Sequence, residues 1–428
     1  GRAGVCRPAI CFFTHHSQVP MTPDTLGRSP RPAFSDWRGR FSSSIPDRYR
    51  GMVLIALAMG TGGVGWSGNV FTLPVAVLFP MLWARSPGRV TAAAVAAGYF
   101  LAASRGLPQG VAAFFGASVW AGILLWFAAS LSFVAVHAAL WSPRQRPGRY
   151  TLAAVLMAVP PFGIVGWAHP VTAAGVLFPG WGWWGLGAAG LGLLAMTTRA
   201  WPVATALMAG AWIWSAAHWA PPLPPEGWRG IDTELSSTLG EGHALDQHRT
   251  LATLVIDAAA EGAKVVILPE SALGPLTPTA ARFWTEALAG RGVTAIAGAV
   301  VIRPDGYDNT LAVIGPAGAT VAYRSRMSVP VSMWQPWRAL LGDAGGAGAT
   351  FFADPVVDAD GQSVAPLICY EQLLIWPVLQ SMLYRPDALV GIANGWWATG
   401  TSVPAIQLVA LTAWARLFNL PLVTAFNR

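Results

Sequence analysis

The sequence predicts a multi-span α-helical membrane domain followed by a layered α/β domain. Apolar residues make up 54% of the 428 residues and charged residues only 11%, whereas an average soluble protein carries about 25% charged residues. Between residues 51 and 225 there is no Asp, Glu or Lys, and the charged side chains are seven arginines. After residue 226, short apolar β-like runs alternate with amphipathic stretches. These observations exclude a single soluble globule and a disordered chain.

Charge divides the chain into three parts. Residues 1–50 carry a net charge of +5, the arginine-only stretch carries +7, and residues 226–428 carry −5. We expect a basic, disordered tail over 1–50, a membrane domain over 51–220 and a separate polar domain over 226–428. The overall charge of +7 then reflects arginines that flank membrane spans, so it does not indicate nucleic-acid binding.

The membrane part can be divided into seven spans. A membrane helix needs about 20 apolar residues, and arginines, glycines and prolines separate the candidates. The expected spans are 52–67, 69–84, 90–104, 112–140, 151–168, 183–198 and 202–219. The fourth is long for one span, which leaves open a tilted helix or a re-entrant turn.

The arginines predict the orientation of these spans, because Lys and Arg in short loops collect on the cytoplasmic side. With the basic tail inside, all but one of the seven arginines fall inside, and Arg105 alone falls outside. Because the number of spans is odd, residues 226–428 then lie on the side of the membrane opposite the cytoplasm. We expect a multi-pass protein of the bacterial inner membrane with a cytoplasmic N-terminus and a periplasmic C-terminal domain.

The polar part reads as an α/β domain, because strands alternate with helices. The apolar runs predict strands at 263–268, 293–301, 310–314, 320–323, 364–368 and 388–393. Spacing close to 3.6 residues predicts helices at 248–262 and 280–291.

Three motifs in this domain carry recognisable chemistry. The run VVILPES ends a strand at Glu270, a hairpin and loop occupy 307–336, and LICYE places Cys369 and Glu371 after another strand. A Cys at a strand end is often only a small buried apolar residue. A nucleophilic thiol, by contrast, requires a neighbouring base. Because Glu270 and Cys369 each follow a buried strand, we expect them to meet in one cleft beyond the strand ends, with Glu371 alongside.

Together these motifs resemble the carbon–nitrogen hydrolase (nitrilase) superfamily, in particular its membrane branch, the apolipoprotein N-acyltransferases. The chain is also similar to the TraB group of conjugal transfer proteins. The resemblance implies an α-β-β-α sandwich over 226–428 that is C-terminally short. The sequence has no P-loop, no G-x-G-x-x-G after a strand and no H-E-x-x-H, so we expect no cofactor and no metal. The resemblance also implies Glu270 as general base, Cys369 as the nucleophile that forms a thioester, and Glu371 as a supporting residue.

The match breaks at the lysine that stabilises the oxyanion in this superfamily. Alignment on the surrounding motif places Ser325 at the lysine position and Met333 at a second glutamate position. The chain has one lysine, Lys264, which precedes Glu270 in the same strand. Arg324 and Arg326 are the nearby cations, and we expect both to point away from the site, into solvent or toward acids.

Two functions remain open at this stage. One is a non-catalytic membrane component of plasmid conjugation that keeps the fold and binds a lipid or a component of the conjugation apparatus. The other is an active amidase or N-acyltransferase that moves an acyl group from a membrane lipid or lipid-linked substrate through Cys369. A transporter is disfavoured because the spans contain no acidic residue to carry a proton or cation.

Overall fold

The computed structural model describes residues 47–144, 146–235 and 244–428. The tail expected over 1–50 lies outside these residues except for its last four, which already belong to helix α1 (Asp47–Gly65). The chain from Pro46 onward forms one compact unit.

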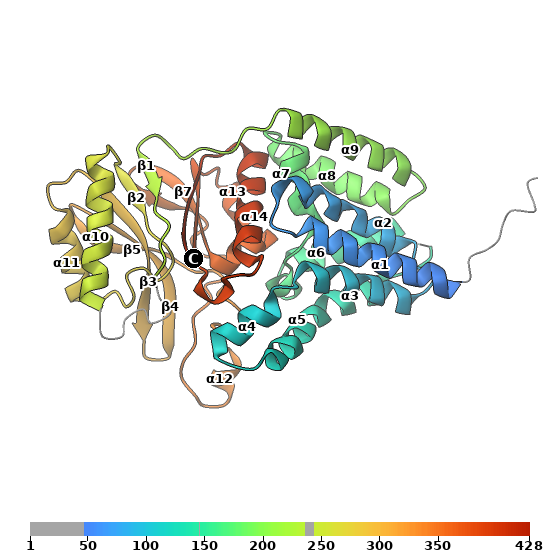
Figure 1. The fold of residues 1–428 in the computed structure, drawn as a ribbon, viewed down its shortest axis with the longest axis horizontal. Helices are drawn as coiled ribbons and strands as arrows, with labels where there is room; N and C mark the ends of the chain where they lie inside the picture. The colour runs from blue at the N-terminus through green and yellow to red at the C-terminus, as the bar shows by residue number, and fades with distance from the viewer. Residues whose placement is uncertain (1–46, 145, 236–243) are drawn as a thin grey trace, which may run out of the picture. The chain divides into compact units, whose positions relative to one another are not determined.

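The N-terminal part of this unit is helical (Figure 1). After α1 it contains η2 (Val70–Leu78), α2 (Phe79–Ala84), α3 (Arg89–Ala103), α4 (Leu107–Phe115), α5 (Val119–Leu140), α6 (Arg146–Ala158), η3 (Phe162–Val165), η4 (Pro170–Ala173), α7 (Ala174–Leu177), α8 (Gly182–Met196) and α9 (Trp201–Ala217). Aromatic side chains dominate its core. Phe79 stacks on Tyr99 with ring centroids 4.4 Å apart, and Trp66 donates to the Tyr99 hydroxyl at 2.9 Å.

The helices are more broken than the sequence predicted. Among the described residues, α5 alone is long and apolar enough to cross a membrane by itself, and α3 with α4, bent by 56°, would make a second span. Of the alternatives left open for 112–140, a continuous tilted helix is wrong, because Gly116 has φ +57° and ends α4 before α5 begins. The segment expected over 151–168 also stops early, since α6 ends at Ala158 just before two prolines.

The second part contains two sheets. The first has the order β1-β2-β3-β4-β5, parallel from β1 to β3 and antiparallel from β3 to β5. The second has the order β6-β7-β8-β9, with β7, β8 and β9 parallel. Their bounds are β1 (Trp228–Gly230), β2 (Val265–Ile267), β3 (Thr294–Arg303), β4 (Gly306–Gly315), β5 (Gly318–Arg324), β6 (Val357–Ala359), β7 (Gln362–Ile368), β8 (Ala388–Asn394) and β9 (Leu422–Asn427).

Helices cover the outer face of each sheet. On the first sheet lie α10 (Ala244–Ala260) and α11 (Pro278–Leu288), with Val255 and Trp284 packed against the strands. On the second lie α13 (Ile375–Leu383) and α14 (Val403–Phe418), while α12 (Trp337–Leu340) is a short turn in a loop (Figure 1). This arrangement confirms the predicted α-β-β-α sandwich. All six expected strands are present; β1, β6 and β9 were not predicted.

Helix α14 joins the two parts of the unit. Its outer side packs against α7, where a Cβ atom on Gly175 would lie 1.6 Å from the carbonyl oxygen of Ala413. Glycine is therefore required at this crossing, and the helical part approaches the sandwich backbone to backbone.

Candidate active site

Cys369 occupies a sharp turn between β7 and the 3-10 helix η5 (Cys369–Leu373). Its φ of +50° lies in the left-handed region, which a residue with a side chain adopts only at a cost. The turn directs the thiol beyond the end of the strand, where it is 6% exposed. Gln407 of α14 donates to the Cys369 carbonyl oxygen at 3.0 Å and approaches Sγ at 3.7 Å. The turn at Cys369, called the elbow below, is therefore held in place by α14.

Glu270 follows β2 and is 3% exposed. Its Oε1 accepts a hydrogen bond from Asn309 Nδ2 at 2.6 Å, and its Oε2 accepts one from the Asn394 backbone N–H at 2.8 Å. Behind it lies Gly298 of β3, where a Cβ atom would come within 2.4 Å of the Glu270 Cα. Both carboxylate oxygens are thus fixed, and the glycine makes room for the backbone that carries them.

The structure brings Glu270 and Cys369 together, although their strands belong to different sheets. The thiol and the carboxylate line the same cavity, and they lie close enough for the carboxylate charge to act on the thiol. Burial raises the pKa of Glu270 above its ordinary value. Burial, followed by the negative charge of Glu270, raises the pKa of the Cys369 thiol well above its ordinary value. The resting site therefore keeps the thiol protonated, and attack on an acyl carbon requires proton transfer to Glu270.

Glu371 lies next to this pair but has a different role. It is fully buried, and its Oε1 accepts from Tyr323 Oη at 2.8 Å, Ser325 Oγ at 3.1 Å and the backbone N–H groups of Arg326 and Met327 at 2.6 and 3.1 Å. Its Oε2 accepts from the Ile368 N–H at 2.7 Å. Glu371 is not among the residues that line the cavity. It ties the end of β5 to the Cys369 elbow.

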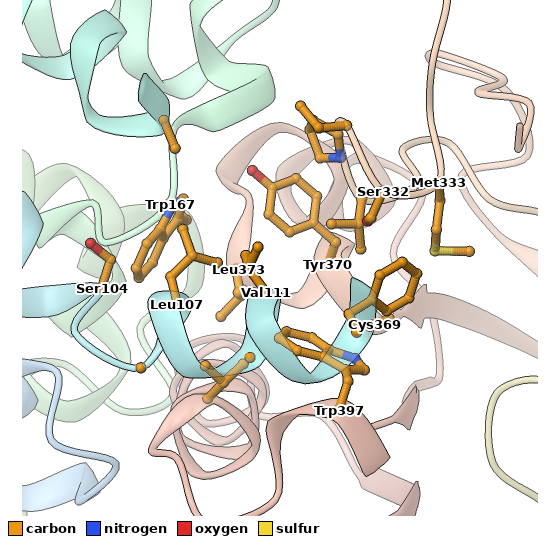
Figure 2. Close-up of a pocket in the computed structure, with 18 of the residues that line it drawn as sticks. Ser104, Leu107, Val111, Trp167, Ser332, Met333, Cys369, Tyr370, Leu373 and Trp397 are labelled. Carbon is orange, nitrogen blue, oxygen red and sulfur yellow. The ribbon is translucent and has the colours of Figure 1, made fainter. Parts of the chain in front are cut away.

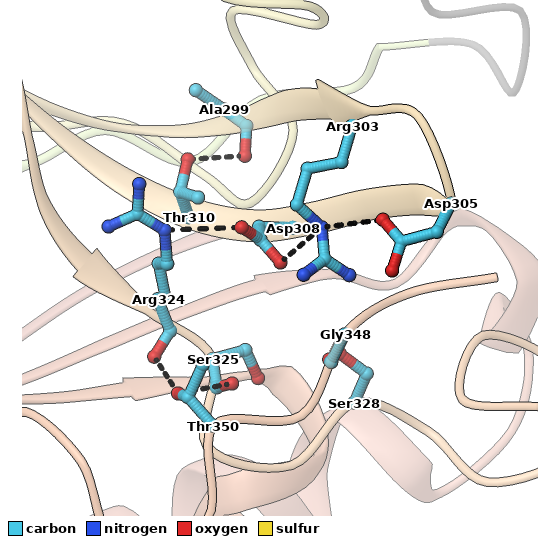
Figure 3. Close-up of polar contacts among 10 residues, drawn as sticks. All are labelled: Ala299, Arg303, Asp305, Asp308, Thr310, Arg324, Ser325, Ser328, Gly348 and Thr350. Carbon is cyan, nitrogen blue, oxygen red and sulfur yellow. Dashed lines mark hydrogen bonds and ion pairs between the residues drawn. The ribbon is translucent and has the colours of Figure 1, made fainter. Parts of the chain in front are cut away.

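Ser325 is 3% exposed, and its hydroxyl faces Glu371 rather than the cavity. Arg324 turns to Asp308 at 3.1 Å, as expected, and Asp308 also binds Arg303 at 3.3 Å (Figure 3). The only lysine, Lys264, is exposed at the start of β2, opposite the end that leads to Glu270.

Arg326 points away from the cavity, as expected, but the expected solvent or acidic partner is wrong, because this side chain is fully buried and pairs with no carboxylate among the described residues. It donates to Tyr323 Oη at 3.0 Å and to the carbonyl oxygens of Pro377 and Pro366 at 2.9 and 3.2 Å. These neutral acceptors satisfy the guanidinium inside the sandwich. Neither Arg324 nor Arg326 lines the cavity, so neither replaces the missing lysine.

A cavity of about 450 Å³ leads away from Glu270 and Cys369 (Figure 2). Its floor is the sandwich, and its far wall is formed by α4 and α5 of the helical part. The lining is mostly apolar and includes Leu107, Val111, Phe114, Leu125, Trp167, Val329, Met333, Tyr370, Leu373, Trp396 and Trp397. Met333, at the family's second glutamate position, adds to this apolar wall.

Sequence reasoning missed the contribution of α4 to the cavity. Gly110 permits this approach, because a Cβ atom there would lie 2.5 Å from the Trp397 ring, but a glycine within an apolar segment does not by itself indicate a cavity. Asn309, Asn394 and Gln407 were missed as well, because each contacts the pair from a distant part of the sequence.

The sequence profile of the carbon–nitrogen hydrolase family matches residues 101–416. The chain belongs to the carbon–nitrogen hydrolase family. It is also 55% identical to the conjugal transfer protein TraB of Agrobacterium fabrum over 420 residues, which cover 95% of this chain and all of that protein. A probable conjugal transfer protein TraB of Sinorhizobium fredii is 55% identical over 383 residues, 89% of this chain and 99% of that one.

Solved structures of carbon–nitrogen hydrolases are more distant. An amidase from Nesterenkonia sp. is 15% identical, with a TM-score of 0.34, and the match covers 46% of this chain and 73% of the amidase. A carbon–nitrogen hydrolase from Helicobacter pylori G27 is 15% identical, with a TM-score of 0.36, and the match covers 46% and 72%.

Proposed function

We propose that the chain is an inner-membrane component of plasmid conjugal transfer. It binds an acyl chain beside Cys369 but catalyses acyl transfer through this residue only poorly. The observation that carries this proposal is the apolar cavity that ends at Cys369 with Ser325 in place of a cation. The role of the relatives, as their names state it, supports the conjugal part of the proposal.

The surface of the helical part supports a membrane location. Large apolar side chains are exposed along α5 and α9, among them Trp120, Leu124, Leu131, Leu207 and Ile213. Water disfavours such continuous apolar faces, whereas lipid accommodates them. On this basis we propose that the helical part lies in the bilayer, with the broken helices at depths where protein buries their ends.

The arginines support the proposed orientation. Arg50 at the start of α1 donates to the Arg85 carbonyl oxygen at 3.1 Å, so these two residues lie at one end of the helical part. Arg105 donates to the Gly63 and Trp66 carbonyl oxygens near the other end of α1, and its neighbour Gly106 abuts Thr401 of the sandwich. The arginine-rich end is therefore away from the sandwich, which suits a periplasmic sandwich.

Poor turnover follows from the missing oxyanion donor. Removing one such donor from an enzyme costs about 10²- to 10³-fold in turnover. In the described site the nearby cations have other partners: Arg324 forms an ion pair with Asp308, and Arg326 donates to backbone carbonyl oxygens. An acyl chain can still enter the cavity, because apolar burial does not require the lysine.

The test uses the purified full chain in detergent with a phospholipid that carries a clickable acyl chain. We expect saturable binding and only slow, hydroxylamine-sensitive labelling of Cys369, absent from Cys369→Ala. Val111→Trp or Leu125→Trp should block binding by filling the cavity, whereas Val119→Trp, at an exposed position, should not. Unchanged binding in both cavity variants would refute the proposal.

The second candidate is an active amidase or N-acyltransferase. The observation in its favour is that the strained Cys369 elbow and the Glu270 base are both intact. This candidate predicts many turnovers per protein molecule, abolished by Glu270→Gln. Labelling that stops at one acyl group per chain would reject it.

A further inference from the structure

A second cavity, of about 640 Å³, lies in the helical part at the end away from the sandwich. Three turns meet there: the residues after α2, the start of α6 and the connection between α8 and α9. Four arginines line it, Arg85, Arg144, Arg146 and Arg199, with Thr197, Thr198 and Trp201. We call this the arginine pocket.

One wall of the arginine pocket is fixed by packing. The Arg85 guanidinium stacks on the Trp201 ring at 4.5 Å from its centroid and donates to the carbonyl oxygens of Met81 and Met196 at 3.2 and 3.4 Å. Arg146 is part-buried, and its Nε is buried without a hydrogen-bond partner among the described residues. A buried donor without a partner is costly, so this atom points to a ligand that supplies an acceptor.

The positive charge of the arginine pocket is not balanced by the protein around it. Residues 51–225 contain no Asp or Glu. In the part of the chain that the structure describes, none of the ion pairs involves these four arginines. Like charges held together disfavour the empty pocket, and a bound anion removes that penalty.

We propose that the arginine pocket binds a phosphate group. Guanidinium groups present planar forks that match phosphate oxygens two at a time. The helices α6 and α9 also begin here, at Arg146 and Trp201, so the positive ends of two helix dipoles face the same space. The phosphate can belong to a phospholipid headgroup or to a soluble phosphate. The site needs no chemistry at Cys369.

The experiment measures phosphate binding to the purified full chain in an uncharged detergent at constant ionic strength. In one arm, native mass spectrometry counts bound dioleoyl phosphatidylglycerol against dioleoylglycerol, which lacks the phosphate. In the other arm, equilibrium dialysis measures radiolabelled inorganic phosphate against excess chloride. The variants are Arg144→Gln and Arg199→Gln, both at exposed positions, and the matched control is Arg89→Gln, an exposed arginine outside the pocket.

We expect saturable binding in at least one arm, weakened about tenfold or more by each pocket variant and unchanged by Arg89→Gln. Binding of the phospholipid alone identifies a headgroup site, and binding of inorganic phosphate identifies a site for a soluble ligand. Absence of binding in both arms would overturn the proposal. Equal binding by all three variants and the natural chain would overturn it as well, since the arginines would then be mere surface charge.

Discussion

At Glu371, five hydrogen-bond donors meet one carboxylate, and none of them belongs to a substrate. Three of the donors are backbone N–H groups, from β7 and from the turn after β5. The charge thus holds two segments of the sandwich in register next to Cys369. Its effect on chemistry is indirect, through the position of the elbow.

We predict that Glu371→Gln lowers the free energy of unfolding by about 3 kcal/mol. The glutamine side-chain NH2 group is itself a donor, so it would face N–H and O–H donors that need an acceptor. Thermal or denaturant unfolding of the full chain in detergent measures this. The matched variant Ser325→Ala loses one of the five bonds and should cost about 1 kcal/mol. Equal costs for the two variants would contradict the central role given to the carboxylate.

The raised pKa of Glu270 predicts a pH-dependent stability. Because burial raises this pKa in the folded state, the folded protein binds the proton more tightly than the unfolded chain does. The stability contribution of the protonated form is complete below the ordinary carboxyl pKa and is lost as pH rises through the raised value. A tenfold difference in proton affinity between the folded and unfolded states corresponds to about 1.4 kcal/mol of stability.

Unfolding measured between about pH 4 and pH 8 should therefore show the natural chain losing stability relative to Glu270→Gln as pH rises. Parallel curves for the two proteins over that range would show that the folded state does not perturb the carboxyl group.

The missing lysine predicts a gain of function. Ser325→Lys should increase the rate of thioester formation on Cys369, because an ammonium group near the elbow stabilises the oxyanion. Restoring Met333→Glu as well should increase it further. The rate of hydroxylamine-sensitive labelling measures this, with Cys369→Ala as the blank. A labelling rate in Ser325→Lys no higher than in the natural chain would reject the assignment of this position.

The residues that sequence predicted for the site are those with strong local context. Glu270 and Cys369 each end an apolar strand, and Ser325 stands in a motif of fixed spacing. The surroundings of Arg326, just after β5, were not predicted. Alternation along an extended segment predicts the direction of a side chain, but it does not predict which hydrogen-bond acceptors lie in that direction. Those acceptors are the carbonyl oxygens of Pro366 and Pro377, in β7 and α13.

At the scale of elements, the break between α4 and α5 shapes the cavity. Gly116 ends α4 in the left-handed conformation, and Gly122 of α5 then approaches Pro108, where a Cβ atom would lie 2.2 Å from the carbonyl oxygen. The two helices are thus locked as a close pair. Their apolar side chains form one wall of the cavity at Cys369.

We predict that Gly116→Ala lowers stability by about 1 kcal/mol, since an L-residue disfavours this φ although no neighbouring atom obstructs a Cβ. Gly60→Ala, in the middle of α1 and equally unobstructed, should instead be neutral or stabilising. Melting of the two variants in the same detergent tests the difference. An equal loss of stability in both variants would show that the left-handed conformation of Gly116 is not the cause of the loss.

Sequence predicted six of the nine strands in the described part of the chain, and length does not separate these six from the rest. β2 has three residues and was predicted, whereas β9 has six and was missed. β1 pairs with β2, which lies far away in the chain, while β6 is a short strand that pairs with the adjacent β7 across a tight turn. Likewise, apolar composition revealed the helical part but could not reveal where Gly116 and the prolines interrupt it.

For the whole molecule, orientation is the property to test. Alkaline phosphatase fused after Pro225 should be active, because that position precedes the sandwich on the proposed periplasmic side. The same enzyme fused near Arg146 should be inactive, because the proposed orientation places the arginine-rich end in the cytoplasm. Phosphatase activity in whole cells, normalised to fusion protein level, measures both. The reverse pattern would overturn the orientation and with it the periplasmic cavity.

Helix α14 contacts α7 of the helical part at Ala413 and the Cys369 elbow at Gln407. The first contact is backbone to backbone, so α7 cannot shift without moving α14. With the helical part in the bilayer, as proposed, α14 links a movement of α7 to the position of the Cys369 thiol. We therefore expect the reactivity of Cys369 to change gradually with the thickness of the membrane in which it is measured.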